Sequence, residues 1–231
     1  MSRSLTRSAP RTVASLAREN ARLLRKVAQL EHLAAESRHR ACHDGLTGLP
    51  NRALLLERLN QALLLGLRKN TTVGVLMIDL DGFKSVNDRF GHRTGDLLVR
   101  QFAARLLSCI RASDTACRYG GDEFVIMVPQ ASGVQEIQAL RQKLATQLSL
   151  PYQLGEHLVV VGASIGTAVF NREATDSDAL IHAADMAMYA AKANRLVGYG
   201  SRRDSDRRRE FPETANNGTR PSGSNVSAQS E

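Results

Sequence analysis

Acidic side chains occur at two places where a strand is expected to end or begin. Asp79 and Asp81 follow the apolar run 73–78, which has the pattern of a buried central strand, and Asp122–Glu123 follow the glycine pair Gly120–Gly121. If the two strands are neighbours, these carboxylates lie close together, and a divalent cation would relieve their repulsion. Such hard oxygen ligands suit Mg²⁺ or Mn²⁺, which bind a few carboxylates together with the phosphates of a substrate.

The segment after the first acidic pair carries groups that a nucleotide would need. Gly82 and Phe83 can turn backbone N–H groups outward into an anion-binding nest, and Lys84 can add a positive charge for a phosphate. Asn87 and Asp96 offer an amide and a carboxylate, which could bind the edge of a guanine. Taken singly, each of these residue types is more often a helix cap or a solvated surface group.

The elements around these groups alternate between helices and short strands. The glycines at 120–121 predict a hairpin turn and leave the backbone open to a bulky ligand. An α/β sandwich is therefore expected, with helices over a mixed sheet. Periodicity predicts helices over 51–65, 97–110, 134–148 and 177–193, and strands over 73–78, 116–119, 123–128 and within 158–170.

Residues 11–37 have the heptad pattern of a coiled coil. Valine at two a positions, leucine at d and a single asparagine favour a parallel pair of helices, with Lys26 and Glu31 placed to pair across it. A single amphipathic helix packed on its own domain would explain the same pattern. The a positions are Val13, Asn20, Val27 and Ala34, and the d positions are Leu16, Leu23 and Leu30.

Composition limits the class of protein. A chain of 231 residues that is 42% hydrophobic can form one ordinary domain with residues left over. Cys42, Cys109 and Cys117 form no C-x-x-C pair or Cys/His cluster, which favours a reducing compartment and a cytoplasmic location. No window approaches the roughly 20 uninterrupted apolar residues that cross a bilayer, so no membrane span is expected.

The net charge of +8 is unevenly distributed. Residues 1–40 hold 9 basic and 3 acidic side chains, whereas residues 41–200 have a net charge of only +1. Because the central region has no helix-turn-helix or aromatic RNA-binding pattern, no specific nucleic-acid partner is expected. The polar compositions of residues 1–10 and 200–231 predict disorder.

Three motifs together resemble a known family. Residues 118–124, R-Y-G-G-D-E-F, resemble the signature hairpin of the GGDEF-domain diguanylate cyclases. Residues 43–52, H-D-G-L-T-G-L-P-N-R, are similar to the motif that opens this domain, and residues 79–96 to its metal and guanine segment. The motifs occur in the family's order and spacing, so the resemblance covers about residues 42–195. The cyclase domain is expected over 42–199, after a coiled-coil helix over 11–41 that the heptads predict.

The resemblance implies a ferredoxin-like core of the nucleotidyl-cyclase and polymerase-palm type. It implies a homodimer, joined here through the coiled coil, that converts two GTP into cyclic di-GMP and two pyrophosphates. Two Mg²⁺ ions, or Mn²⁺, would bind in each active site. The implied metal ligands are Asp79, the Leu80 carbonyl, Asp122 and Glu123; the catalytic residues are Asp122, Glu123 and Lys84; and the substrate-binding residues are Gly82, Phe83, Lys84, Asn87, His92, Asp96, Gly120, Gly121, Lys192 and Arg195.

A second site is implied by R-x-x-D at residues 111–114. In the family this motif binds the product away from the metals, and Arg111 and Asp114 would do so here with Arg141. An ordinary surface ion pair would also explain the motif.

The last helix departs from the family pattern. It has A-K-A-N-R-L where the family has A-K-x-x-G-R-N, which places Arg195 about 100° from the expected position. Two other functions remain open: a weak or inactive module that binds GTP or cyclic di-GMP and signals through its coil, and a cyclase with a mixed purine product, against which the acidic Asp96 argues.

Overall fold

The computed structural model describes residues 12–170 and 176–200, with side chains through residue 194. The predicted disorder of residues 1–10 and of the tail beyond 200 lies outside these ranges. The helices are α1 (Val13–Cys42), α2 (Arg52–Lys69), α3 (Phe83–Phe90), α4 (His92–Cys109), α5 (Val134–Leu148) and α6 (Ser177–Gly200). The strands are β1 (Thr72–Asp81), β2 (Thr115–Arg118), β3 (Glu123–Ala131), β4 (Tyr152–Leu154), β5 (His157–Val159) and β6 (Gly162–Val169).

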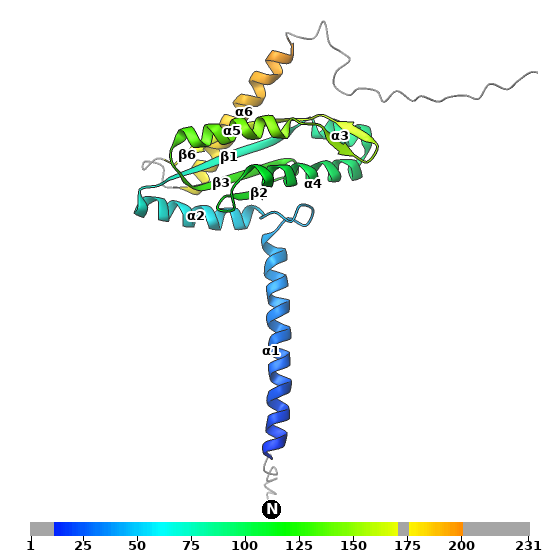
Figure 1. Ribbon diagram of the computed structural model, residues 1–231, viewed down its shortest axis with the longest axis vertical. Coiled ribbons are helices and arrows are strands. Elements are labelled where there is room, and N and C mark those ends of the chain that lie inside the picture. The colour runs from blue at the N-terminus through cyan, green and yellow to red at the C-terminus, as the bar shows by residue number, and fades with distance from the viewer. Residues whose placement is uncertain (1–11, 171–175, 201–231) are drawn as a thin grey trace, which may run out of the picture.

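The central sheet has the strand order β2-β3-β1-β6 (Figure 1). The expected α/β arrangement of helices over a sheet is confirmed, but each strand pair in this sheet is antiparallel, whereas a mixed sheet was expected. The difference arises because the glycine hairpin folds β3 back between β1 and β2. Strands β1 and β2 are therefore not neighbours, and the sequence did not reveal which strand would lie beside β1.

Strand β1 has helices on both of its faces, as its apolar run predicts. Leu76 and Ile78 pack in the core formed with α4 and α5, whereas Val75 and Met77 pack in the core formed with α2 and α6. Because side chains alternate along a strand, the next odd position, Asp79, also faces the α2 and α6 side. The hydrophobic pattern of β1 thus determines which helix meets this carboxylate.

Helix α6 lies directly on strand β6 because Gly166 has no side chain. A Cβ atom at this position would collide with the backbone of Ala184 and Met188 in α6. The close contact brings the later turns of α6 over the end of β1, where Lys192 reaches Asp79. Gly166 therefore helps to position the acidic edge of the sheet.

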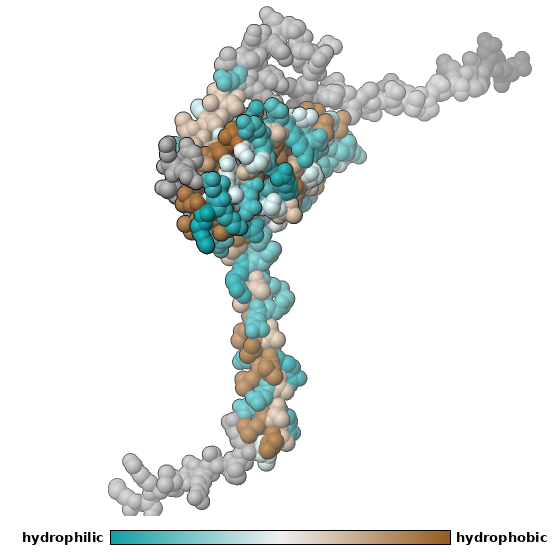
Figure 2. Space-filling view, turned by 60° about the vertical axis from the view of Figure 1, so that its left-hand side comes forward, coloured by the Kyte–Doolittle hydropathy of each residue, from teal (hydrophilic) through white to brown (hydrophobic). Residues whose placement is uncertain are grey.

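Helix α1 extends away from the domain and buries none of its 30 residues (Figures 1 and 2). Thr12 caps its first turn by accepting a hydrogen bond from the Ser15 N–H. After the helix ends, His43 pairs with Pro50 and the Asn51 N–H donates to the Cys42 carbonyl, which anchors the base of the helix. The alternative of an amphipathic helix packed on its own domain is therefore wrong.

Two short elements were given no bounds from the sequence, although β5 overlaps the strand-like segments expected within 158–170 and a helix start was expected next to Phe83. Helix α3 follows β1 directly, and the hairpin of β4 and β5 lies beyond the end of α5. Arg105 anchors this hairpin by donating to the carbonyls of Leu150 and Pro151 and lying over the Tyr152 ring. None of the helices in the described part of the chain is both long and apolar enough to cross a membrane.

Candidate active site at the acidic edge of the sheet

The two acidic segments lie side by side, as expected for neighbouring strands. Asp79 at the end of β1 is paired in register with Glu123 at the start of β3, and the Leu80 N–H donates to the Asp122 carbonyl at 3.1 Å. The antiparallel pairing therefore brings residues that are 43 positions apart in the chain to one edge of the sheet.

Asp79 is almost completely buried and is bound by a lysine. Its side chain is 8% exposed, and its Oδ2 atom lies 2.6 Å from Nζ of Lys192 in α6. This hydrogen bond is the main cause that raises the pKa of Lys192 above its ordinary value. Without another cation, the ammonium group compensates the buried carboxylate.

The other two carboxylates of this edge are electrostatically crowded. Burial, followed by the charge of Asp79, raises the pKa of Asp122, and burial followed by the charges of Asp122 and Asp79 raises the pKa of Glu123. Asp185 in α6 adds to the effect on Glu123. Raised carboxyl pKa values next to like charges are typical of functional sites, because such a cluster binds cations and protons readily.

The donor atoms of this edge fit a magnesium ion. The carboxylates of Asp79, Asp122 and Glu123 supply hard oxygen ligands, and the Lys192 ammonium stands where positive charge is needed. Among the described residues, no three acidic, histidine or cysteine side chains converge on one point. This arrangement suits Mg²⁺, which takes few protein ligands and completes its shell with water and substrate phosphates.

An arginine holds the glycine hairpin that carries Asp122. Arg118 donates to the Gly121 carbonyl from Nε at 3.1 Å and from Nη2 at 2.7 Å, while its Nη1 lies 3.1 Å from both Asp44 carboxylate oxygens. Burial opposes ionisation of Asp44, but hydrogen bonds from Thr47 and Arg118 outweigh it and lower its pKa. The opening motif is thus joined directly to the signature hairpin.

The predicted nucleotide-binding segment lies beside this edge. Gly82, with φ 78°, begins α3, Phe83 is partly buried, and Lys84 is exposed. The Oδ1 atom of Asn87 is buried without a hydrogen-bond partner in the described structure, against Gly95.

The remaining predicted nucleotide-binding residues have fewer described contacts. His92 and Asp96 are exposed on the first turns of α4, with Asp96 next to the Gly95 that contacts Asn87. Gly120 leaves no room for a Cβ beside the Glu123 side chain. Arg195 belongs to α6, but its side chain lies outside the described part of the chain.

The R-x-x-D residues form a compact turn before β2. The Arg111 N–H donates to Asp114 Oδ2 at 3.0 Å, and the Asp114 N–H donates to the Arg111 carbonyl at 3.0 Å. Arg141 instead donates to Gln138 on its own helix, and no described contact joins it to Arg111. The assignment of Arg141 to this site stays a prediction.

Sequence reasoning missed several residues that contact the predicted ones. Asp44 is in the opening motif and Arg118 is in the signature hairpin, so membership of these motifs was a sequence signal that could have pointed to both residues. Glu136, which forms an ion pair with Arg111, and Asp185, which acts on Glu123, carried no such signal. Each is a single acidic residue on a helix, a pattern that any solvated helix shares.

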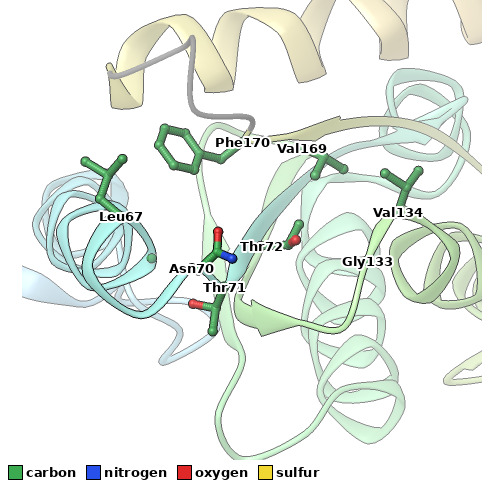
Figure 3. A pocket seen from close by; sticks show the side chains of 9 residues that line it. Leu67, Asn70, Thr71, Thr72, Gly133, Val134, Val169 and Phe170 are labelled. Carbon is green, nitrogen blue, oxygen red and sulfur yellow. The ribbon is translucent and has the colours of Figure 1, made fainter.

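A separate pocket of about 370 Å³ lies at the opposite end of β1 (Figure 3). None of its lining residues belongs to the acidic edge, and the site assignment therefore rests on the carboxylates and not on this hollow. The lining residues are Gly66, Leu67, Asn70, Thr71, Thr72, Gly133, Val134, Val169 and Phe170.

The fold and the acidic edge define an α+β domain of the cyclase type. The chain belongs to the GGDEF family: the family profile described as "Diguanylate cyclase, GGDEF domain" matches residues 41–196. It is 45% identical over 159 residues to MucR of Pseudomonas aeruginosa, a bifunctional diguanylate cyclase/cyclic di-GMP phosphodiesterase. It is also 39% identical over 178 residues to the diguanylate cyclase TpbB of the same species.

These alignments cover 69% and 76% of this chain, but the chain spans only 23% of MucR and 40% of TpbB. Among solved structures, the coiled coil and GGDEF domain of DgcB from Caulobacter crescentus, in complex with c-di-GMP, is similar with a TM-score of 0.73. That match is 26% identical and covers 78% of this chain and 95% of the other. The similarity therefore includes both a coiled coil and a GGDEF domain in the matched protein.

Proposed function

We propose that this protein is a diguanylate cyclase that condenses two GTP molecules into cyclic di-GMP and two pyrophosphates. The observation that carries the proposal is that Asp79, Asp122 and Glu123 lie at adjacent positions on one edge of the sheet, in a chain whose signature motif is intact. A receptor that had lost catalysis would not be expected to retain every acidic group of this cluster.

The proposed chemistry is a pair of phosphoryl transfers. In each, the 3′-oxygen of one GTP forms a bond to the α-phosphorus of the other, and the bond to the leaving pyrophosphate breaks. Asp122 accepts the proton of the 3′-hydroxyl, a role that its raised pKa supports because a carboxylate with a higher pKa is a stronger base. Bound Mg²⁺ would supply electrostatic stabilisation of the charge on the transferred phosphate.

Other residues of the chain bind and orient the nucleotide. The backbone at Gly82 and Phe83 and the exposed Lys84 contact the phosphates, while Lys192 leaves Asp79 to do the same once cations bind. The unpartnered Oδ1 atom of Asn87 would accept a hydrogen bond from the base, next to Asp96. Gly121 and Gly120 keep the hairpin free of side chains where the nucleotide approaches.

Ring closure requires two domains because each holds one GTP. Each 3′-hydroxyl must lie in line with the α-phosphate of the other nucleotide, which places two domains around a two-fold axis. Helix α1 supplies a means of joining them, since its apolar side chains are exposed in the single chain: Leu16 is 44%, Leu23 52% and Leu30 57% exposed (Figure 2). A parallel pair of α1 helices would raise the effective concentration of the two domains.

Product identification tests the function. Purified protein is incubated with GTP and Mg²⁺, and the products are separated and identified by mass spectrometry, with an equimolar GTP and ATP mixture as a second substrate. Cyclic di-GMP and two equivalents of pyrophosphate are expected. A mixed purine cyclic dinucleotide from the GTP and ATP mixture would show that the enzyme does not select guanine alone. Tight nucleotide binding without turnover would show that the protein is a nucleotide receptor and not a cyclase.

Product inhibition through Arg111 and Asp114 is part of the proposal. The exposed guanidinium of Arg111 and the turn that holds it suit a phosphate ligand. Arg111→Ala is expected to relieve inhibition by added cyclic di-GMP with unchanged initial rates. An identical inhibition curve would remove this site from the proposal.

A further inference from the structure

Arg111 forms an ion pair with Glu136, a residue that lies outside all of the motifs described above. It lies in the turn between α4 and β2, and its Nη1 atom is 2.6 Å from Oε1 of Glu136, near the start of α5. The arginine side chain is 69% exposed, whereas that of Glu136 is 21% exposed. The guanidinium thus reaches from an exposed turn to a carboxylate that is mostly sheltered.

The carboxylate of Glu136 is held in place independently of Arg111. Its Oε2 atom accepts hydrogen bonds from the Ser132 N–H at 2.8 Å and the Ser132 hydroxyl at 2.7 Å. These bonds, the backbone bond first, lower the pKa of Glu136, so it is ionised at neutral pH. Lys143 donates to the Cys109 carbonyl at 2.8 Å and joins α5 to the end of α4.

The ion pair therefore joins a carboxylate that Ser132 also holds to a guanidinium that is largely exposed. A phosphate and a carboxylate accept hydrogen bonds from the same guanidinium N–H groups, so a phosphate would compete with Glu136 for the Nη1 atom of Arg111. Two anions around one exposed arginine also repel each other. A phosphate ligand of Arg111 must either displace Glu136 or bind against its charge.

We propose that Glu136 is a residue of the product-binding site, where its carboxylate competes with a phosphate of the bound dinucleotide for Arg111 and so sets the product concentration at which inhibition begins. This inference rests on the proposed product site at Arg111 and Asp114. It assigns Glu136 a regulatory contact and no part in turnover, since Glu136 lies outside the acidic edge of the sheet.

The test is the substitution Glu136→Gln, which keeps an oxygen to accept the Ser132 bonds and removes the charge. The concentration of cyclic di-GMP that halves the rate is expected to fall about threefold, the range of a surface ion pair, with an unchanged initial rate. Binding of cyclic di-GMP measured by calorimetry should tighten by the same factor. An unchanged or higher half-inhibiting concentration would overturn the proposal.

Ser132→Ala is the matched control, because it removes the hydroxyl bond to the other oxygen of Glu136 and leaves the charge and Arg111 in place. It is expected to leave inhibition unchanged. A threefold effect from this variant would show that the start of α5, and not competition for Arg111, determines the affinity.

An Arg111→Ala background separates the two proposals. If Glu136 acts through Arg111, adding Glu136→Gln to Arg111→Ala changes neither product binding nor inhibition, and a residual threefold gain would indicate a general charge effect instead. If Arg111→Ala alone leaves inhibition intact, the product site itself is misplaced. If Arg111→Ala relieves inhibition but Glu136→Gln has no effect, only the role of Glu136 is wrong.

Discussion

Helix α1 and strand β1 differ in the burial of their apolar side chains. Strand β1 buries eight of its ten residues between two layers of helices, whereas the 30 residues of α1 include none that is buried. The exposed leucines of α1 are as apolar as those of the core, and single exposed apolar residues are common, but a heptad row of them is not. The domain buries its apolar side chains within one chain, whereas α1 leaves its apolar row exposed, as the proposed pairing of two α1 helices would require.

This difference predicts that substitutions in the domain and in α1 reduce turnover in two different ways. A change in the domain alters each copy of the site, so protein concentration cannot compensate for it. A change in the α1 seam alters only how often two sites meet, so a higher protein concentration should compensate. The four predictions that follow test this distinction, and the first two do so most directly.

The largest effect is expected from Asp122→Asn. Turnover should fall at least about a hundredfold at every protein concentration, because the base and a metal ligand are lost together. The same change removes a crowded negative charge, so the thermal midpoint of the metal-free protein should rise. Rates are measured by pyrophosphate release and midpoints by circular dichroism.

Glu57→Gln, an exposed substitution on α2, is the control for Asp122→Asn and should change neither quantity. Mg²⁺ should raise the thermal midpoint of the native protein more than that of Asp122→Asn. Equal stabilisation of the two proteins by Mg²⁺ would place the metal site elsewhere.

Polar replacement of the seam leucines is expected to act through concentration. With Leu16, Leu23 and Leu30 all changed to glutamine, turnover per chain should fall about a hundredfold at micromolar protein and recover as protein is added. Replacing Ala14, Ala21 and Ala28, which lie off the seam, with glutamine gives the matched control, which should keep its activity at micromolar protein. Sedimentation reports the oligomeric state, and full activity in a monomer would contradict the role of α1.

Arg118→Met tests the link between the opening motif and the hairpin. Loss of the bonds to Asp44 and Gly121 should lower the free energy of unfolding by about 1–3 kcal/mol, since the partly buried Asp44 carboxylate keeps its Thr47 bonds but loses its only described ion-pair partner. Turnover should fall as well, because Gly121 precedes Asp122. Urea unfolding measures the stability.

Arg68→Met, on the exposed last turn of α2, is the control for this change. If the concentration dependence of turnover changed with Arg118→Met, the arginine would belong to the dimer contact and not to the domain alone.

The smallest effect expected is that of pH on the metal-free protein. Asp122 and Glu123 have raised pKa values, so they increasingly oppose folding as pH rises above the ordinary values of 3.8 and 4.5, and stability should increase as pH is lowered from neutrality towards those values. Asp44 has a lowered pKa and acts in the opposite sense: its contribution is present above 3.8 and is lost below it.

Urea unfolding of the native protein and of Asp122→Asn across this range provides the measurement. The substitution should flatten the increase towards lower pH, because one of the two groups responsible has gone. A parallel dependence in the two proteins would assign the effect to groups outside the acidic edge.

Local patterns in the sequence were sufficient for much of this protein. The heptads predicted a helix over 11–37 that is now α1, and periodicity predicted α5 with both of its ends correct. The apolar run before Asp79 predicted a strand with helices on both faces. These features follow from residues a few positions apart, because helical and strand periodicity depend on neighbours along the chain.

Only the tertiary structure decided which distant residues meet. Lys192 bonds to Asp79 across 113 positions, Arg118 to Asp44 across 74, and Arg111 to Glu136 across 25. The antiparallel order of the sheet and the close contact of α6 with Gly166 were equally hidden. Such pairings depend on how whole layers pack and which faces they bury, and charged residues on separate elements carry no sign of that arrangement in their own neighbourhood.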